Sequence, residues 1–334
     1  MAVVGAGVAG LAAAAELARR GVRTVVYEQF SVGHPYGSSH GRSRIFRLAY
    51  PEPGWVRLAV ESLDGWRSLE RETGTPIVEQ VGLVEIVGDL ADSSIEALRE
   101  CALPYEVLEA DDAERRFAIR VEEGEMAVLE PFGGYVRADE ALSAFLEVAA
   151  RGGAELREGE RVADLGAIEA DAVVVAAGAW ARDLLAQAGI DLPVHVTRET
   201  VAYFRLGGDR PVPSVAKLRP GTHRHAVYGL HDPDFGLKLG CHFCGPEADP
   251  DAPGEPDAAI VDELSRWALD VFPGVDPQPA AAETCLYTST SDEDFVLERH
   301  GRIVVGSACS GHGFKFGPAI GERLALLALE ALDS

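Results

Sequence analysis

Short apolar runs alternate with amphipathic stretches along most of the chain. A helical period is clearest at Val56–Leu69, where the apolar side chains share one face. Further helices are expected at Ala138–Ala150, Ala258–Val271 and Ala319–Leu332. The runs that predict strands are Ala2–Val4, Thr24–Tyr27, Leu83–Val87, Ala172–Ala176, Val201–Leu206 and Ile303–Val305.

The order of these elements predicts an α/β fold. Strands and helices alternate near both ends of the chain, whereas the middle is richer in strands and turns. We therefore expect a Rossmann-type dinucleotide-binding domain, assembled from separated segments, with an inserted sheet-rich α+β domain for the substrate. We assign residues 1–78, 135–195 and 281–334 to the first domain, and residues 79–134 and 196–280 to the second.

The N-terminus carries the clearest motif, a short strand followed directly by G-x-G-x-x-G. Gly5 would permit the tight turn, Gly7 would let the backbone approach a pyrophosphate, and Gly10 would let helix and strand pack closely. The Ala-rich run that follows favours a helix whose N-terminal N–H groups face the phosphates. The second strand ends at Glu28, where a carboxylate accepts hydrogen bonds from a ribose.

Two observations favour FAD over a nicotinamide cofactor. The fingerprint occurs once in the chain, so a second nucleotide has no copy of it. The later strand Ala172–Ala176 runs into the small residues Ala177 and Gly178 and then Trp180. Small residues there would allow this strand to lie close to the dinucleotide.

Charge and composition limit the partners. The chain holds 30 Lys and Arg against 54 Asp and Glu, a formal net charge of −24. Such a surface repels phosphate backbones and anionic lipids, so we expect neither nucleic acid nor membrane as a partner. Five cysteines in 334 residues do not suggest a disulfide framework, and a cytoplasmic protein is expected.

Cys241 and Cys244 form a C-x-x-C motif that could hold zinc or undergo redox chemistry. No second ligand pair follows at a suitable spacing, and the segment resembles a strand whose residues alternate faces. We expect no metal there. His223 and His225 are expected in a loop.

Polar residues that a packed core does not need gather in three segments, 37–47, 236–242 and 310–317. Arg44 and Arg47 would share a face if the first segment were helical. With Cys285 and Tyr287 in a TCxYT motif, and SGHGFKF near the C-terminus, these segments resemble the monomeric sarcosine oxidase and N-methyltryptophan oxidase family, within the D-amino-acid-oxidase-like FAD-dependent oxidoreductases.

The resemblance implies an FAD-dependent oxidase, a monomer or weak homo-oligomer, that acts on a small amine or amino acid. A secondary amine or N-methyl amino acid would become an imine, which water hydrolyses to aldehyde and amine, and O2 would become H2O2. Cys285 corresponds to the cysteine joined to the 8α carbon of FAD, and Lys238 to the lysine that promotes reaction with O2. Arg47 and Lys315 correspond to the pair that holds the substrate carboxylate, and Tyr228, His242 and Tyr287 to residues around the substrate. The FAD contacts would be Gly5, Gly7, Val8, Ala9, Gly10, Glu28, His40, Ser43, Arg44, Val162, Ala177, Gly178, Trp180, Cys285, Gly311, Gly313, Phe314 and Lys315.

Several alternatives stay open from the sequence alone. Residues 211–228 are more basic than this family's pattern, so a cyclic imino acid such as pipecolate or proline would also suit the chemistry. A flavin dehydrogenase with an acceptor other than O2, an NAD-dependent dehydrogenase and an inactive subunit of a heteromer are further possibilities.

Overall fold

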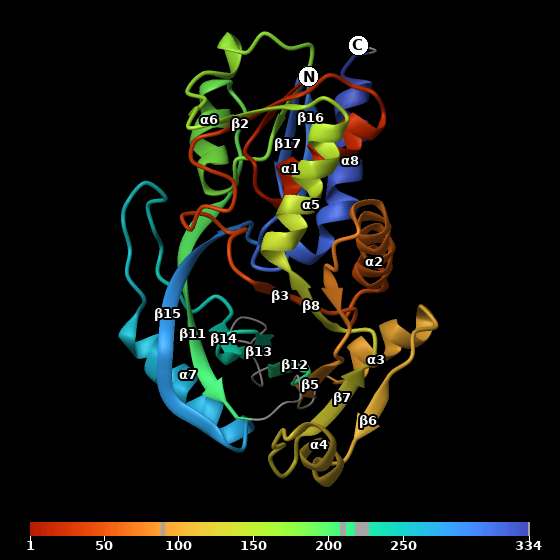
Figure 1. The fold of residues 1–334 in the computed structure, drawn as a ribbon, viewed down its shortest axis with the longest axis vertical. Coiled ribbons are helices and arrows are strands. Elements are labelled where there is room, and N and C mark those ends of the chain that lie inside the picture. Colours follow the sequence, from red (N-terminus) through yellow and green to blue (C-terminus); the bar gives the residue numbers. More distant parts are fainter. Residues whose placement is uncertain (88–90, 208–211, 218–226, 333–334) are drawn as a thin grey trace.

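Two large sheets lie at opposite ends of the molecule (Figure 1). The computed structural model describes residues 1–87, 91–207, 212–217 and 227–332. His223, His225 and most of the basic stretch therefore lie outside the described residues. Both chain ends belong to the upper lobe in Figure 1.

The first sheet has a parallel core. Strands β2 and β10 flank β1 in parallel, and β17 and β9 extend this arrangement on either side, while β16 pairs antiparallel with β17. Helix α1 connects β1 to β2, so the α/β fold predicted from the sequence is confirmed. The strand order is β16 (Val296–His300), β17 (Ile303–Ser307), β10 (Val173–Val175), β1 (Ala2–Val4), β2 (Val25–Glu28) and β9 (Glu155–Glu158).

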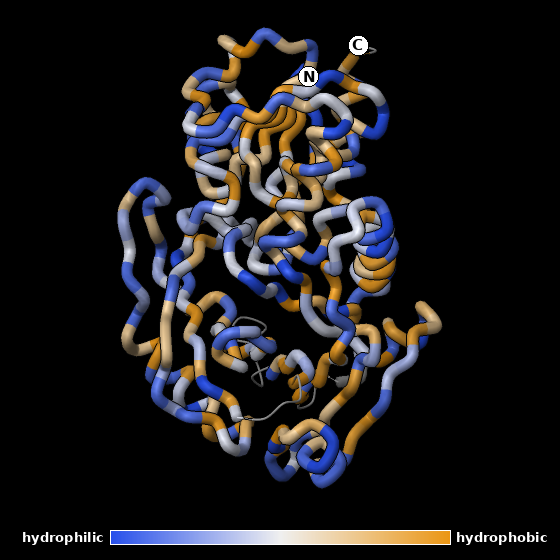
Figure 2. Tube along the Cα trace, in the orientation of Figure 1, coloured by the Kyte–Doolittle hydropathy of each residue, from blue (hydrophilic) through white to orange (hydrophobic). Residues whose placement is uncertain are grey.

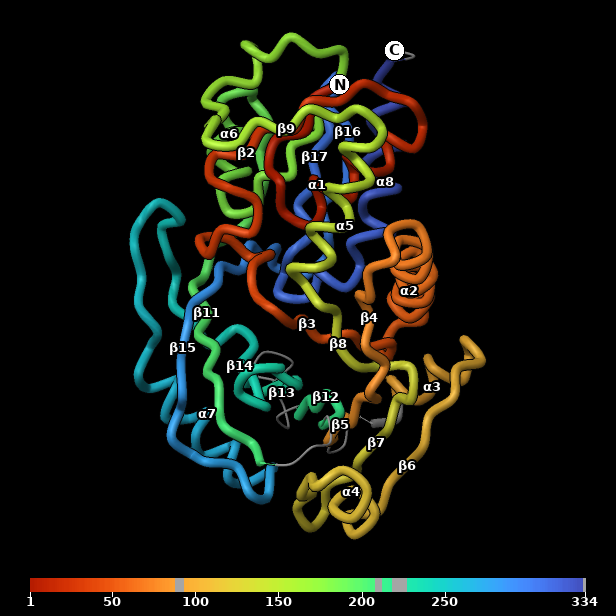
Figure 3. Tube along the Cα trace, in the orientation of Figure 1, coloured from red at the N-terminus to blue at the C-terminus, as the bar shows by residue number. Residues whose placement is uncertain are grey.

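Helix α1 (Val8–Arg19) is apolar on almost every side, because other elements surround it. It packs against α5 (Ala138–Arg151) and α8 (Gly317–Glu330), two helices that lie far away in the sequence (Figure 3). The strands beside it are the most continuously hydrophobic part of the upper lobe (Figure 2). The remaining helices of this lobe are α2 (Pro53–Thr73), α6 (Ala181–Gln187), η1 (Leu165–Ala167), η2 (Gly178–Trp180) and η3 (Phe314–Phe316).

The second large sheet is mixed. Its two longest strands, β11 and β15, run side by side along one edge of the molecule and reach the upper lobe (Figure 1). Helix α7 (Ala258–Val271) covers this sheet, and α3 (Ala91–Glu100) and α4 (Ala110–Phe117) lie near its other end. The strand order is β15 (Val275–Ser289), β11 (His195–Leu206), β14 (Gly236–Cys241), β13 (Val227–Asp232), β12 (Ser214–Lys217), β5 (Leu83–Val87), β7 (Met126–Glu130) and β6 (Glu106–Leu108).

A small antiparallel sheet lies between the lobes, in the order β3 (Ser43–Phe46), β8 (Gly134–Arg137) and β4 (Val78–Glu79). Arg44 therefore lies on a strand and Arg47 directly follows it, so the segment is not helical and the condition for a shared helical face is not met. Strand β14 ends at Cys241, so the C-x-x-C motif turns away from the sheet instead of continuing it. Among the described residues, no helix has both the length and the apolar character that a bilayer crossing needs.

Candidate active site

One large cavity lies where the carboxyl ends of β1, β2 and β10 meet. In the sheet, β2 and β10 lie on opposite sides of β1, and ligands of parallel α/β sheets bind at such a switch point. The cavity measures about 1190 Å³ and extends to residues of β3, β13, β14 and β15. This exceeds the ~300–1,000 Å³ of most small-ligand sites and leaves room for a cofactor together with a substrate.

The glycine fingerprint forms the end of this cavity nearest the parallel sheet. Gly5, Gly7, Val8 and Ala9 line it at the N-terminus of α1. Gly10 does not line it and faces the strand instead, where a Cβ would overlap the Gly5 carbonyl oxygen. Gly10 thus allows the close helix–strand contact expected from its position.

Glu28 lies at the end of β2 and is almost fully buried. Its carboxylate accepts hydrogen bonds from the N–H groups of Ala6 at 2.8 Å and Phe30 at 2.9 Å, which fixes it against the cavity. Four further residues predicted to contact the dinucleotide line the same end: Val162, Ala177, Gly178 and Trp180.

Three buried polar side-chain atoms indicate that the cavity is built to bind a ligand. His40 Nε2, Ser43 Oγ and Thr288 Oγ1 have no hydrogen-bond partner among the described residues, and all three residues line the cavity. Buried polar groups without partners are costly, so a ligand with hydrogen-bonding atoms should complete them. FAD carries such atoms along its ring and chain. Burial, with the nearby Arg44 cation, lowers the pKa of His40 to about 4, so its imidazole is neutral.

Lys238, on β14, places a cation near these unpaired polar atoms. Its Nζ lies 3.5 Å from the Ser43 carbonyl oxygen and 4.0 Å from Glu283 Oε1, and the side chain is only 4 % exposed. Burial, followed by the charge of Arg44, lowers the pKa of Lys238 to about 8. The lysine is therefore a cation at neutral pH and loses its charge above pH about 8.

Arg47 and Lys315 meet at the ring of Tyr50. The Arg47 guanidinium lies 4.3 Å from the centre of that ring, and the Lys315 ammonium donates to the Tyr50 hydroxyl at 2.9 Å. Lys315 also donates to the His312 carbonyl oxygen at 2.7 Å and is 1 % exposed. Burial and then Arg47 hold the pKa of Lys315 well below its usual range. A guanidinium therefore meets an amine whose charged form an anion would favour, which makes this point suited to bind an anion.

Three aromatic residues form a further part of the cavity wall. The His242 Nδ1 and Tyr287 hydroxyl lie 3.5 Å apart, and Tyr228 lines the cavity beside them. Burial raises the pKa of both tyrosines, so the phenols stay protonated at neutral pH.

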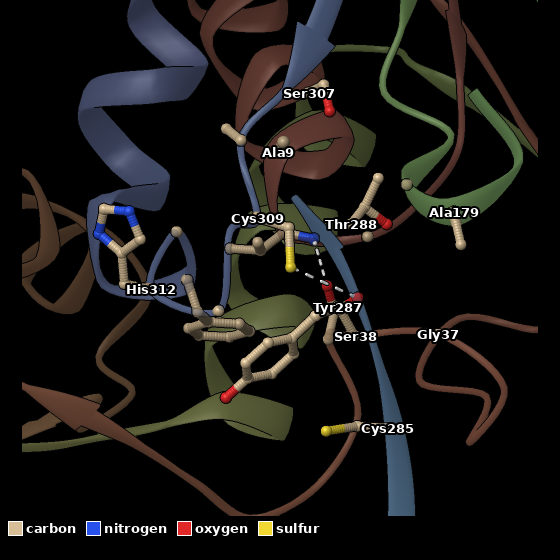
Figure 4. A pocket seen from close by; sticks show the side chains of 18 of the residues that line it. Ala9, Gly37, Ser38, Ala179, Cys285, Tyr287, Thr288, Ser307, Cys309 and His312 are labelled. Carbon is tan, nitrogen blue, oxygen red and sulfur yellow. Dashed lines mark hydrogen bonds between the residues drawn. The ribbon is translucent and has the colours of Figure 1, made fainter. Parts of the chain in front are cut away.

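Cys285 lies on β15 with its thiol free and its side chain lining the cavity. Figure 4 shows it on the same strand as Tyr287 and Thr288. The Cys309 thiol donates to the Ser38 hydroxyl at 3.8 Å. Burial raises the pKa of Cys285 to about 11, against the opposing charges of Arg44 and Lys238. The SGHGFKF residues Gly311, Gly313 and Phe314 complete the lining.

The sequence did not predict three neighbours of the cation pair. Tyr50 contacts both cations, and Glu85 lies 3.5 Å from Arg47 although it is 2 % exposed. Glu130 accepts hydrogen bonds from the N–H groups of Leu48 and Ala49, and burial together with Glu85 raises its pKa to about 7. Both acids lie on strands, where an isolated Glu usually marks the solvent face. The chain offered no signal that they are buried.

Cys241 and Cys244 are joined by a disulfide. Among the described residues, no group of three His, Cys, Asp or Glu side chains could hold a metal ion.

Comparison with known proteins identifies the family. Residues 1–327 match the family model DAO, described as FAD dependent oxidoreductase. The chain is 33% identical to the peroxisomal sarcosine oxidase of Homo sapiens, covering 99% of this chain and 92% of that protein. It is 32% identical to the monomeric sarcosine oxidase of Bacillus sp. strain B-0618, covering 98% and 91%.

A solved structure agrees with these relatives over the whole chain. NikD, an unusual amino acid oxidase essential for nikkomycin biosynthesis, superposes with a TM-score of 0.88 at 30% identity, covering 100% of this chain and 94% of NikD. Family and fold together exclude the NAD-dependent alternative. The chain belongs to the DAO family of FAD-dependent oxidoreductases, together with the sarcosine oxidases.

Proposed function

We propose that this enzyme oxidises an N-methyl amino acid of the size of sarcosine, with O2 as electron acceptor. Sarcosine, O2 and water would give formaldehyde, glycine and hydrogen peroxide. The observation that carries the proposal is the convergence of Arg47, Lys315 and Lys238 on one cavity that also holds unpaired polar atoms. The sarcosine oxidase relatives favour this substrate class over a cyclic imino acid and over an acceptor other than O2.

Arg47 and Lys315 would bind the substrate carboxylate. A guanidinium offers two parallel hydrogen bonds to a carboxylate, and an ammonium adds a point charge. The Tyr50 ring already positions both cations, so little side-chain freedom is lost on binding. His242, Tyr228 and Tyr287 would then enclose the amine end and exclude water.

FAD, when bound, supplies the two-electron redox chemistry. His40, Ser43, Arg44 and Thr288 would hold it through hydrogen bonds. Lys238 would keep a positive charge where O2 takes up its first electron and becomes an anion. Because Lys238 is buried, water screens that charge little.

Cys285 would bind FAD covalently, through a thioether between its sulfur and the 8α carbon of FAD. The bond replaces the thiol hydrogen and one hydrogen of the 8α methyl group, and O2 takes up the two electrons released. Cys285 suits this role because its thiol is free and lines the cavity. Cys309 is also free and lines the cavity, but its thiol donates to the Ser38 hydroxyl.

The visible spectrum of the purified protein tests the proposal. Under anaerobic conditions, excess sarcosine should bleach the oxidised-flavin band at about 450 nm. Admitting air should restore the band and yield one peroxide for each sarcosine consumed. A yellow protein that sarcosine does not bleach would refute the substrate assignment, while bleaching without peroxide would refute O2 as the acceptor.

A further inference from the structure

The C-x-x-C motif lies directly beside the substrate wall. Cys241 ends strand β14 and is buried, whereas Cys244 is partly exposed at the other end of the turn. Their Cα atoms are 5.6 Å apart, a separation typical of natural disulfides. The bond closes a loop that contains only His242 and Phe243.

Both enclosed residues contact the active site. The His242 ring lies 5.5 Å from the Tyr287 ring between centres, and Phe243 packs edge-on to Tyr287 at 5.7 Å. A Cβ at Gly311 would overlap both His242 and Tyr287, so these rings have no space to shift toward it. A change in the turn therefore changes the shape of the cavity.

The turn is also strained. Phe243 has φ +57°, in the left-handed region that bulky side chains rarely adopt. Such a conformation persists only where the surroundings enforce it, and the disulfide across the turn does so. The chain beyond the turn is fixed separately, because Glu199 accepts hydrogen bonds from the N–H groups of Cys244 at 3.0 Å and Gly245 at 2.8 Å. Opening the disulfide would then release the two enclosed residues and leave the strands in place.

We propose that Cys241 and Cys244 form a reversible redox site that sets the position of His242 and Phe243, with hydrogen peroxide as its oxidant. The choice of oxidant rests on the proposed function, because peroxide would be the product released a few residues away. In the disulfide form the turn is held against Tyr287, and the substrate cavity keeps the shape seen in this structure. In the dithiol form Phe243 leaves the left-handed region, and His242 moves with it.

The redox step balances with the two thiols and one peroxide. The Cys244 thiolate attacks one peroxide oxygen and breaks the O–O bond, which gives a sulfenic acid and, with the thiol's proton, one water. The Cys241 sulfur then displaces the sulfenic hydroxyl, which leaves with the Cys241 proton as the second water. The two sulfurs together lose two electrons, and the two peroxide oxygens gain them.

The test compares the two redox states of one holoenzyme preparation. Protein is reduced with a thiol reagent and desalted, and half of it is treated with one equivalent of reagent H2O2. The mass of the peptide that contains both cysteines reports the disulfide. The KM for sarcosine and the dissociation constant for acetate, read from the flavin absorbance, report the cavity.

Reduction should raise both constants about tenfold and leave kcat nearly unchanged, since a left-handed bulky residue costs roughly the free energy of a tenfold change. A double variant, Cys241→Ser with Cys244→Ser, should resemble the reduced enzyme and ignore both reagents. Cys101→Ser is the matched control and should respond as the wild type does, because Cys101 does not line the cavity.

The comparison of reduced and peroxide-treated wild-type enzyme tests the proposal even if the double variant does not fold. Thiols that survive reagent peroxide, or equal constants in both redox states, would overturn the proposal. The acetate arm needs no turnover, so it separates this outcome from a failure of the proposed function. If sarcosine gives no peroxide but reagent peroxide closes the pair and tightens acetate binding, the function is wrong and the redox site stands.

Discussion

Replacing Lys238 by Met should slow the reaction with O2 far more than the reaction with substrate. Lys238 lies on β14 with a side chain that is 4 % exposed, so its charge acts in a medium that water hardly enters. The Glu283 carboxylate lies 4.0 Å away. It also accepts a hydrogen bond from the Tyr203 hydroxyl, so it has a second partner. The lysine charge is thus only partly offset.

The expected size follows from Coulomb's law. A unit charge about 4 Å from a forming anion contributes about 4 kcal/mol at an effective dielectric constant of about 20. Since each 1.36 kcal/mol changes a rate about tenfold, the loss is about 10³-fold before Glu283 is considered. Partial offset by Glu283 reduces it, so we expect about 10²–10³-fold, the usual cost of losing one electrostatic stabiliser.

The assay is stopped-flow reoxidation of the chemically reduced holoenzyme by O2, with anaerobic reduction by substrate measured alongside. The wild-type reoxidation rate should fall as pH rises through about 8, because Lys238 then loses its proton. The Met variant should be slow at every pH. Lys217→Met is the matched control, because that lysine pairs with Glu125 and does not line the cavity. A Met variant that reoxidises at the wild-type rate would refute the assignment of oxygen chemistry to this lysine.

Three further predictions concern the cofactor link, the anion site and a buried acid. Cys285→Ser should release all flavin into the supernatant on acid precipitation, whereas the wild-type protein should keep it; equal release from both would refute the thioether. Arg47→Met should raise the KM for sarcosine about 10–100-fold in initial-rate assays, as expected for a lost charged hydrogen bond, and unaltered KM would count against the carboxylate role. Glu130→Gln should stabilise the protein at pH about 8 by up to about 3 kcal/mol in urea unfolding, with little change at pH about 4. Its folded pKa is raised to about 7, so the protonated acid contributes stability at low pH that is lost as pH rises through about 7; parallel pH curves for variant and wild type would contradict this.

The parts of the site that local sequence patterns predicted, without the family resemblance, are those encoded by adjacent residues. The fingerprint glycines and Glu28 are fixed by a single β–α–β unit, so their spacing alone places them together. SGHGFKF precedes its helix in the same local way. The helix α7 was predicted with its observed bounds, because one apolar face against a sheet leaves a clear period.

What escaped prediction depends on contacts between distant segments. Strand β11 begins at His195, yet only Val201–Leu206 was predicted as strand. The first half of β11 is polar and gives no strand pattern of its own; its pairing with β15 makes it a strand. The turn at Cys241 was taken for strand, since a disulfide across a turn leaves no periodic trace. The boundaries of the two domains stay a prediction.

The two buried acids beside Arg47 and Lys315 do not fully neutralise this pair, which suits the pair to bind an anion. Glu85 lies 3.5 Å from Arg47, and burial raises its pKa, so its proton is held more tightly than in water. Glu130 already accepts two backbone hydrogen bonds and has a pKa of about 7, so at neutral pH it carries only part of a negative charge. Arg47 is never neutral, and Lys315 is held below its usual pKa mainly by burial and by that unmatched charge. A bound carboxylate would remove the repulsion between the two cations and favour the charged lysine. We therefore expect a ligand carboxylate to complete the charge balance of this pocket.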